Sequence, residues 1–297
     1  MKFHIFGDGC LHVNINQNIR NEVFSFGQVS LSPGGNAMNV ARQINRFGGE
    51  VQLYSVLGDD PVGQMISGIL RQEELNCNHI VWQQNSKTTT VCIQLSKQQP
   101  PRLTVEVGEY TKNGVMEALR PFFNQVKPGE PVFIPAYPEY APLFDNLSLS
   151  RGEIFADCGY APYSGHLNEY KQAIVRILNK VNYALVSGFS FRQEDFHFIK
   201  EELEGRRCQA VLVTFAGRGV LWITSDQIRY LETEQVIPIN SIGAGDCFFG
   251  SFMYFMKNHY SLMDSIQFAH KAASWKVQQF DSLPYLQDIG NLMDGLL

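Results

Sequence analysis

A glycine-rich stretch near the C-terminus carries the clearest chemical signal of this sequence. It reads Ser241-Ile242-Gly243-Ala244-Gly245-Asp246, after a β-branched run and before an apolar segment of helical length. Glycines let the backbone bend sharply and let a ligand approach closely. The N–H groups of such a turn, at the start of a helix, attract phosphates. Gly243, Ala244 and Gly245 are therefore predicted to form an anion hole.

Asp246 follows this turn directly. A carboxylate repels a phosphate, so an aspartate beside an anion hole needs a purpose other than anion binding. We predict that Asp246 is a general base, which takes a proton from a hydroxyl group while the turn holds the phosphoryl group being transferred.

A second stretch combines glycines with asparagines. It reads Ser32-Pro33-Gly34-Gly35-Asn36-Ala37-Met38-Asn39 and enters a segment with apolar residues at helical spacing. Asn36 and Asn39 lie one turn apart on one face of that predicted helix. An amide offers both a donor and an acceptor, which suits the recognition of hydroxyl groups. Alternatively, Asn36 merely caps the helix.

The rest of the chain alternates between short apolar runs and amphipathic segments. Strands are predicted at 131–135, 153–157 and 183–186, and helices at 170–178 and 196–203. This alternation predicts a parallel sheet with helices on both faces. Ligands of such sheets bind beyond the carboxyl ends of the strands, where Asp157 is expected.

Composition narrows the class of protein. The 297 residues are 44% hydrophobic and 18% charged, as in globular proteins. The net charge of −5 and the lack of a basic cluster argue against nucleic-acid binding. No apolar run approaches the length of a membrane span, and no signal-peptide core follows Met1. The six cysteines form no C-x-x-C pair, so we expect reduced thiols, no metal site built from protein side chains, and a cytoplasmic location.

Both glycine-rich stretches closely resemble those of the ribokinase-like (PfkB) carbohydrate kinase family, and further matches run from Gly7 to about Gln279. The resemblance implies an α/β fold, a three-layer α/β/α sandwich with a mostly parallel central sheet. We expect residues 1–297 to form one such kinase domain. Strands within about 15–31 and 88–107 would form a small β lid, through which a homodimer is expected. From the residues alone, these regions could equally be edge hairpins of the main sheet.

The resemblance also implies which residues bind the acceptor. In the family, an Asp five residues after the first glycine grips sugar hydroxyls, but here His12 stands at that position, and Asp8 or Asn14 could take part instead. The predicted substrate-binding residues are His12, Gly34, Gly35, Asn36, Asn39 and Asp246.

For the nucleotide, the resemblance implies ATP with Mg²⁺. The family loop T-x-G-x-x-G appears with Ala216 in place of its middle glycine, and Ser187-Gly188-Phe189-Ser190 replaces the N-x-x-E that organises magnesium. Glu194 or Asp195 could supply the missing carboxylate. Because Asn240 replaces a common Asp near the family's monovalent-cation site, we do not expect potassium dependence. The predicted ATP-binding residues are Ser187, Thr214, Ala216, Gly217, Gly219, Ser241, Gly245 and His270.

The predicted function is ATP-dependent phosphorylation of a hydroxyl group on a sugar or sugar-like molecule, as in a fructokinase or ribokinase. The alternatives within the family are a catalytically weakened member that binds nucleotide or sugar, and a nucleoside kinase. A dinucleotide-dependent oxidoreductase is disfavoured, because Gly7-Asp8-Gly9-Cys10-Leu11-His12 lacks the third glycine of the fingerprint. No basic DNA-reading helix is visible.

Overall fold

The computed structural model describes most of the chain. The described residues are 1–17, 27–95, 101–108, 114–137, 140, 144, 152–159, 165–233 and 236–280.

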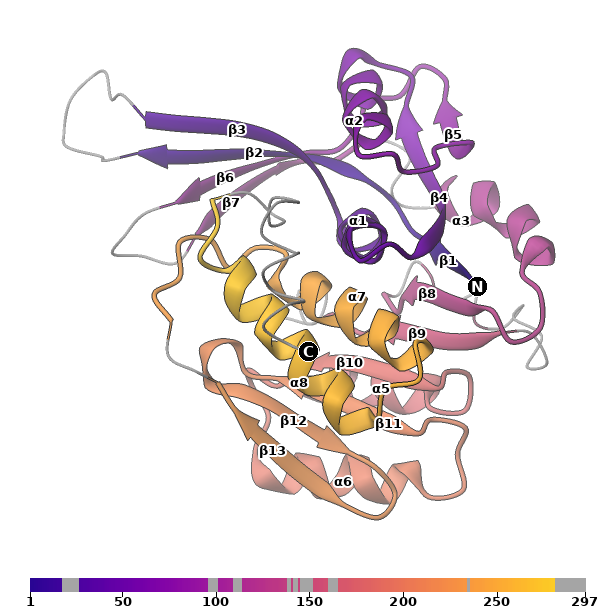
Figure 1. Cartoon of the computed structure of the whole chain (residues 1–297), viewed down its shortest axis with the longest axis vertical. Coiled ribbons are helices and arrows are strands. Elements are labelled where there is room, and N and C mark those ends of the chain that lie inside the picture. The colour runs from indigo at the N-terminus through magenta and orange to yellow at the C-terminus, as the bar shows by residue number, and fades with distance from the viewer. Residues whose placement is uncertain are drawn as a thin grey trace.

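A nine-stranded sheet forms the centre of the molecule, in the order β13-β12-β11-β10-β9-β8-β1-β4-β5 (Figure 1). The seven neighbouring strands from β11 to β5 pair in parallel, whereas β12 at one edge pairs antiparallel with both β11 and β13. The strands are β1 (Lys2–Phe6), β4 (Glu50–Gly58), β5 (His79–Gln83), β8 (Pro131–Pro135), β9 (Glu153–Asp157), β10 (Tyr183–Ser187), β11 (Ala210–Thr214), β12 (Gly219–Ile223) and β13 (Ile228–Glu232).

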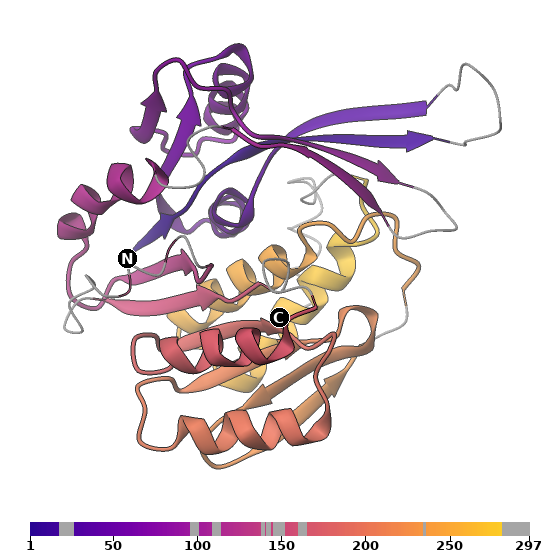
Figure 2. The same cartoon turned by 180° about the vertical axis from the view of Figure 1, so that it is seen from behind.

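Helices cover both faces of this sheet, which confirms the predicted three-layer α/β/α sandwich. One face carries α1 (Asn36–Arg46), α2 (Pro61–Gln72), α7 (Ala244–Lys257) and α8 (Leu262–Lys276). The other carries α3 (Gly114–Leu119), the 3₁₀ helix η2 (Arg120–Gln125), α5 (Leu167–Ile177) and α6 (Gln193–Leu203). Figure 2 shows this second layer in front of the sheet.

The central strands are buried on both faces, as a covered parallel sheet requires. In β10, Ala184 and Val186 pack into one core, while Tyr183 and Leu185 pack into the other. The period-2 alternation of a strand sends successive side chains to opposite cores. This is why the predicted strands read as continuous apolar runs.

A second, four-stranded sheet projects from the body in the order β3-β2-β6-β7 (Figures 1 and 2). Its strands are β2 (Cys10–Gln17), β3 (Gly27–Gly34), β6 (Thr90–Leu95) and β7 (Arg102–Glu106). The two regions expected to supply lid strands thus pair with each other rather than with the main sheet, although residues 18–26 and 96–100 lie outside the described residues. We refer to β2, β3, β6 and β7 as the small sheet.

His12, the residue at the position of the family's sugar-binding Asp, lies inside β2, opposite Ser32 of β3. The chain crosses from the main sheet to the small sheet within Gly7-Asp8-Gly9. Gly7 has a φ of 156°, and a Cβ there would lie 2.6 Å from Cβ of Ala37, so this short crossing needs a residue without a side chain.

Candidate active site

The carboxyl ends of the parallel strands bring polar residues to one edge of the main sheet. Asp8 follows β1, Tyr137 follows β8 and Asp157 ends β9. Farther along the same edge, Ser187 and Thr214 end β10 and β11 and are register partners. These residues come from five strands of one sheet edge, where ligands of such folds bind.

The predicted anion turn lies at the start of α7. Gly243 has a left-handed φ of 81°, a conformation that favours glycine. The Ala244 N–H donates to the carbonyl of Ser241 at 3.2 Å, so this amide closes the turn itself. A Cβ added to Gly245 would meet nothing within 4 Å. Open space therefore lies beside the first turn of α7, whose leading N–H groups have no intrahelical acceptor.

Asp246 is held by the two asparagines of α1. The Nδ2 group of Asn36 donates to Oδ1 of Asp246 at 3.0 Å, and that of Asn39 donates to Oδ2 at 2.7 Å. The two asparagines lie more than 200 residues from Asp246 in the sequence, and packing of α1 against α7 brings them together. Both carboxylate oxygens are thus fixed in direction, while the side chain remains partly exposed.

Asn36 also connects Asp246 to a second carboxylate. Its Nδ2 group donates to Oδ2 of Asp157 at 2.6 Å, and its Oδ1 accepts from the hydroxyl of Tyr137 at 2.9 Å. Both N–H bonds of the Asn36 amide are therefore engaged within the protein. Asn39 differs, since its buried Oδ1 has no hydrogen-bond partner among the described residues.

The electrostatics of this cluster disfavour negative charge. Burial and the nearby charge of Asp157 raise the pKa of Asp246 to about 7, although hydrogen bonds from Asn39 and Asn36 and the charge of Lys276 act in the opposite direction. Burial also raises the pKa of Asp157 and of Asp8. A carboxylate with a pKa near the working pH is suited to accept a proton from a substrate and release it again.

His12 lies near the glycines of the second stretch. A Cβ on Gly34 would lie 2.2 Å from Nε2 of His12, so Gly34 gives the imidazole its space. Burial and the charges of Arg42 and Lys276 lower the pKa of His12 to about 4, which leaves it neutral at pH 7. Gly35 adopts a φ of 90° just before α1, and this turn aims Asn36 toward Asp157 and Asp246.

The predicted nucleotide loop joins β11 to β12. Ala216 begins the 3₁₀ helix η5 (Ala216–Arg218) with a left-handed φ of 50°. Gly219 follows with a φ of 126°, and a Cβ there would lie 2.2 Å from the carbonyl oxygen of Leu231. A Cβ on Gly217 would meet nothing within 4 Å. Ser241 is exposed just before the anion turn.

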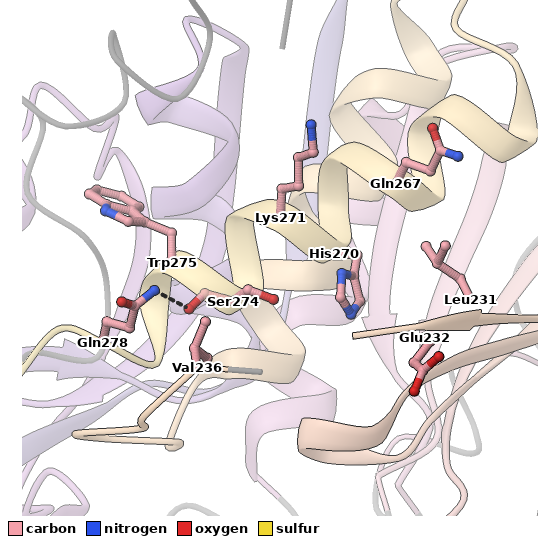
Figure 3. A pocket seen from close by; sticks show the side chains of 9 residues that line it. All are labelled: Leu231, Glu232, Val236, Gln267, His270, Lys271, Ser274, Trp275 and Gln278. Atoms are coloured by element: carbon pink, nitrogen blue, oxygen red, sulfur yellow. Dashed lines mark hydrogen bonds between the residues drawn. The ribbon is translucent and has the colours of Figure 1, made fainter. Parts of the chain in front are cut away.

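A pocket of about 600 Å³ lies between α8, β13 and residue 236. Figure 3 shows His270 directed toward Leu231 and Glu232 across it. The His270 ring also bonds Oγ1 of Thr233. The other lining residues are Val236, Gln267, Lys271, Ser274, Trp275 and Gln278. Of the predicted nucleotide residues, His270 lines this pocket, whereas Ser187, Thr214 and Gly219 lie at the sheet edge.

Asp195 and Glu194, the two predicted replacements for the carboxylate of the missing N-x-x-E, differ in their surroundings. Asp195 is buried, accepts from Lys171 Nζ at 2.8 Å and from the Arg192 N–H at 2.8 Å. Its carboxylate is therefore committed to the start of α6. Glu194 is exposed. Among the described residues, no group of three or more His, Cys, Asp or Glu side chains is placed to hold a metal ion.

Sequence reasoning did not place Tyr137 or Tyr140 in the site. The Tyr137 hydroxyl donates a hydrogen bond to Oδ1 of Asn36, and the Tyr140 hydroxyl donates one to Oδ1 of Asp8 at 2.6 Å. Both follow the predicted strand 131–135, so the expectation that ligands bind beyond strand ends was the signal that could have found them. Within the described part of the chain, no helix combines the length and apolar character needed to cross a membrane.

Comparisons with known proteins show that the chain is a phosphotransferase with a ribokinase-like fold. The profile described as pfkB family carbohydrate kinase matches residues 5–133 and 166–286. The fructosamine kinase FrlD of Bacillus subtilis (strain 168) is 24% identical over 229 residues, 76% of this chain and 77% of that protein. A fructokinase of Vibrio alginolyticus is 23% identical over 262 residues, 80% of this chain and 83% of that protein.

Solved structures show the same fold. A fructokinase from Vibrio cholerae O395, in a form with fructose, ADP and calcium bound, superposes with a TM-score of 0.75 at 17% identity, covering 100% of this chain and 99% of that one. The chain belongs to the pfkB family of carbohydrate kinases. It is accordingly an enzyme of the sugar kinase type, and membership of this family implies ATP as the phosphoryl donor.

Proposed function

We propose that this enzyme phosphorylates a hydroxyl group of a sugar or sugar-like molecule, with Asp246 as the general base. The observation that carries the proposal is the position of Asp246: its carboxylate is oriented by Asn36 and Asn39 and stands at the start of α7, beside the open space at Gly245. A base and an anion-binding helix start are thus adjacent, as phosphoryl transfer to an alcohol requires.

The acceptor site would lie among Asp246, Asn39, Gly35 and His12. The amide oxygen of Asn39, without a hydrogen-bond partner among the described residues, offers an acceptor for a sugar hydroxyl. Neutral His12 offers one donor and one acceptor. Asn36 is engaged with two carboxylates and a tyrosine, so we assign it the orientation of Asp246 rather than a sugar contact of its own.

ATP supplies the transferable phosphoryl group when it is bound. The pocket beside His270 is large enough for a nucleoside and would hold the adenine end, whereas the Thr214–Gly219 loop and Ser187 would line the path to the anion turn. The N–H groups at the start of α7 would stabilise the phosphoryl charge. Mg²⁺ keeps several waters and leans on substrate phosphates, so exposed Glu194, rather than Asp195, is suited to an outer-shell role.

The small sheet is proposed to act as a lid and as the contact of a homodimer. Its register places His12 and Asn14 on the same face as Leu103 and Val105 of β7. The last two are 52% and 49% exposed. The face that looks toward the acceptor site therefore continues into uncovered apolar surface, which the small sheet of a second copy would cover and keep dry.

The experiment that tests the proposal compares wild type with Asp246→Asn in an ADP-release assay containing ATP, Mg²⁺ and a panel of fructose, ribose, a fructosamine-type derivative and a nucleoside. Wild type is expected to turn over at least one sugar. The variant should lose roughly 10²- to 10⁴-fold in kcat, the usual contribution of a general base, without loss of thermal stability.

Asp226→Asn serves as the matched control, because Asp226 is exposed in the β12–β13 turn. It should leave kcat unchanged. Near-normal turnover by Asp246→Asn would show that Asp246 is not the base. Turnover of the nucleoside alone would assign the enzyme to the nucleoside kinases.

A further inference from the structure

Lys276, the last residue of α8, has its whole side chain inside the protein. It is 0% exposed. Its ammonium group donates to the main-chain carbonyl of Asn240 at 2.7 Å and to that of Ile242. Burying an ammonium group is costly unless it is well hydrogen-bonded. The ammonium charge therefore contacts the loop that leads into the anion turn.

That loop, residues 239–242, is tied to the end of α8 by further contacts. The N–H groups of Ile239 and Asn240 both donate to the carbonyl of Val277, at 2.7 and 3.0 Å. The buried side chain of Asn240 accepts from the Ile242 N–H at 2.9 Å and donates to the carbonyl of Phe280 at 2.8 Å. The end of α8 and the loop therefore form one hydrogen-bonded unit, with the Lys276 ammonium inside it.

The direction of the two carbonyls has a consequence for the anion turn. In a trans peptide the C=O and N–H bonds point in opposite directions. When Lys276 draws the carbonyls of Asn240 and Ile242 toward itself, the N–H groups of the following residues, Ser241 and Gly243, are directed away from it. Gly243 is the residue that opens the anion turn.

We propose that Lys276 is a positioning residue that acts as a built-in cation: it fixes the loop before the anion turn and keeps a positive charge near Asp246, so that the enzyme needs no added monovalent cation. The proposal rests on the function proposed above and deepens it. A dissociable cation coordinated by the same carbonyls would have the same effect on the loop, but only at sufficient cation concentration.

The charges around Asp246 support this assignment. The positive charge of Lys276 lowers the pKa of Asp246, while the charge of Asp157 on β9 raises it. From α1, Asn36 and Asn39 donate to the carboxylate. The charge of Asp246 in turn raises the pKa of Tyr137 after β8 and of Cys10 on β2, so these groups face it as well. Removing the ammonium should therefore make Asp246 harder to deprotonate.

The test uses two variants of the full chain. Lys276→Met fills the space without charge, and Lys276→Ala leaves room for a cation. Each is assayed in choline chloride and in KCl or RbCl, for kcat across pH and for Tm. Lys127→Met is the control, because Lys127 is exposed and has no part in the site. Wild type and the control should show the same rate and Tm in choline and potassium salts.

Lys276→Met is expected to lose about 10- to 100-fold in kcat, the scale of a misplaced catalytic group, and to need a higher pH for half-maximal rate, in every salt. Lys276→Ala should recover at least tenfold in rate with KCl or RbCl, with a concentration-dependent rise in Tm and an anomalous Rb⁺ peak between the carbonyls of Asn240 and Ile242. A lysine with only a packing role would lower Tm without moving the pH profile.

The proposal is overturned if wild type requires potassium for activity, or if folded Lys276→Met keeps the wild-type rate and pH profile. It is also overturned if monovalent cations leave Tm of Lys276→Ala unchanged and no Rb⁺ binds. The measurements of Tm and of Rb⁺ binding do not require turnover. If wild type phosphorylates no sugar, the proposed function fails, and the Tm and Rb⁺ measurements still decide whether Lys276 occupies a cation position.

Discussion

At the scale of single residues, the proposed function depends on the protonation state of one carboxylate. Asp246 is partly buried near Asp157, and two amides donate to it. Burial and the charge of Asp157 raise its pKa to about 7, whereas the hydrogen bonds from the two amides act to lower it. The amides orient the carboxylate and keep it in place. A base in this condition exchanges protons readily near neutral pH.

The pH dependence of the reaction follows from this pKa. A general base works unprotonated, so kcat/KM should rise with pH through an apparent pKa near 7 and level off above it. Asp157→Asn removes the charge that opposes ionisation of Asp246, and should move this rise to lower pH. The measurement is kcat/KM from pH 5.5 to 9. A flat profile, or a rise that Asp157→Asn leaves in place, would contradict the assignment.

The raised pKa of Asp246 also makes the free energy of unfolding depend on pH, in the direction opposite to that of kcat/KM. The folded-state pKa of Asp246 lies above its unfolded value of about 3.9, so the folded state binds more protons between about pH 4 and 7. The contribution of Asp246 to the free energy of unfolding therefore decreases as pH rises through this window. Higher stability and higher activity are thus expected at opposite ends of the pH range.

At the scale of elements, short loops with unusual backbone angles position the site. The β11–β12 loop is the clearest case, because Ala216 adopts a φ of 50° at the position where the family loop T-x-G-x-x-G, which this segment resembles, has its middle glycine. For a residue with a Cβ, the left-handed region costs about 1–2 kcal/mol. The neighbouring Gly217 has no such angle. Gly217 therefore lies one position after Ala216, the residue whose backbone conformation favours glycine.

Ala216→Gly should consequently stabilise the protein. The relief of the left-handed strain exceeds the added unfolded-state entropy of glycine, which costs about 0.4–1 kcal/mol. We expect the free energy of unfolding, measured by urea denaturation, to rise by roughly 0.5–1 kcal/mol. Ala118→Gly in α3 is the control and should lower it by about the same amount. A loss of stability in Ala216→Gly would mean that the Ala216 methyl group makes a contact worth more than the strain.

At the scale of the whole molecule, the proposed acceptor site lies between two sheets. The edge of the main sheet supplies Asp8 and Asp157, α7 supplies Asp246, and the small sheet supplies His12 and Asn14. The outer strands of the small sheet keep apolar residues exposed, among them Leu31, Leu103 and Val105. An isolated projecting sheet with such residues is a surface that another chain can cover.

We therefore expect a homodimer in solution. Light scattering after gel filtration should give twice the mass of the chain for wild type. Replacing Leu103 and Val105 together by Glu should give monomers and reduce kcat, because the lid face would stay wet. Met65→Glu on α2 is the control, as Met65 is also partly exposed at 42%. A monomeric wild type, or a doubly substituted chain that remains dimeric, would contradict the proposal.

The sequence by itself determined the layers of the fold and identified the aspartate on which the proposed function depends. Apolar runs such as 131–135 and 183–186 were predicted as buried strands and are β8 and β10, because the burial of a parallel strand on both faces leaves a continuous signal. The Gly-Ala-Gly-Asp turn was equally readable, because its glycines and its aspartate are adjacent in the chain.

Only the tertiary structure decided what surrounds Asp246. Asn36, Tyr137 and Lys276 meet in its neighbourhood from elements far apart in the sequence, and no local pattern records such encounters. Lys276 reads as an ordinary helix-terminal lysine until α8 is packed against the loop at Asn240. Local sequence specifies backbone conformation and burial, whereas the pKa of a carboxylate and the partners of a buried charge depend on contacts formed when distant elements pack together.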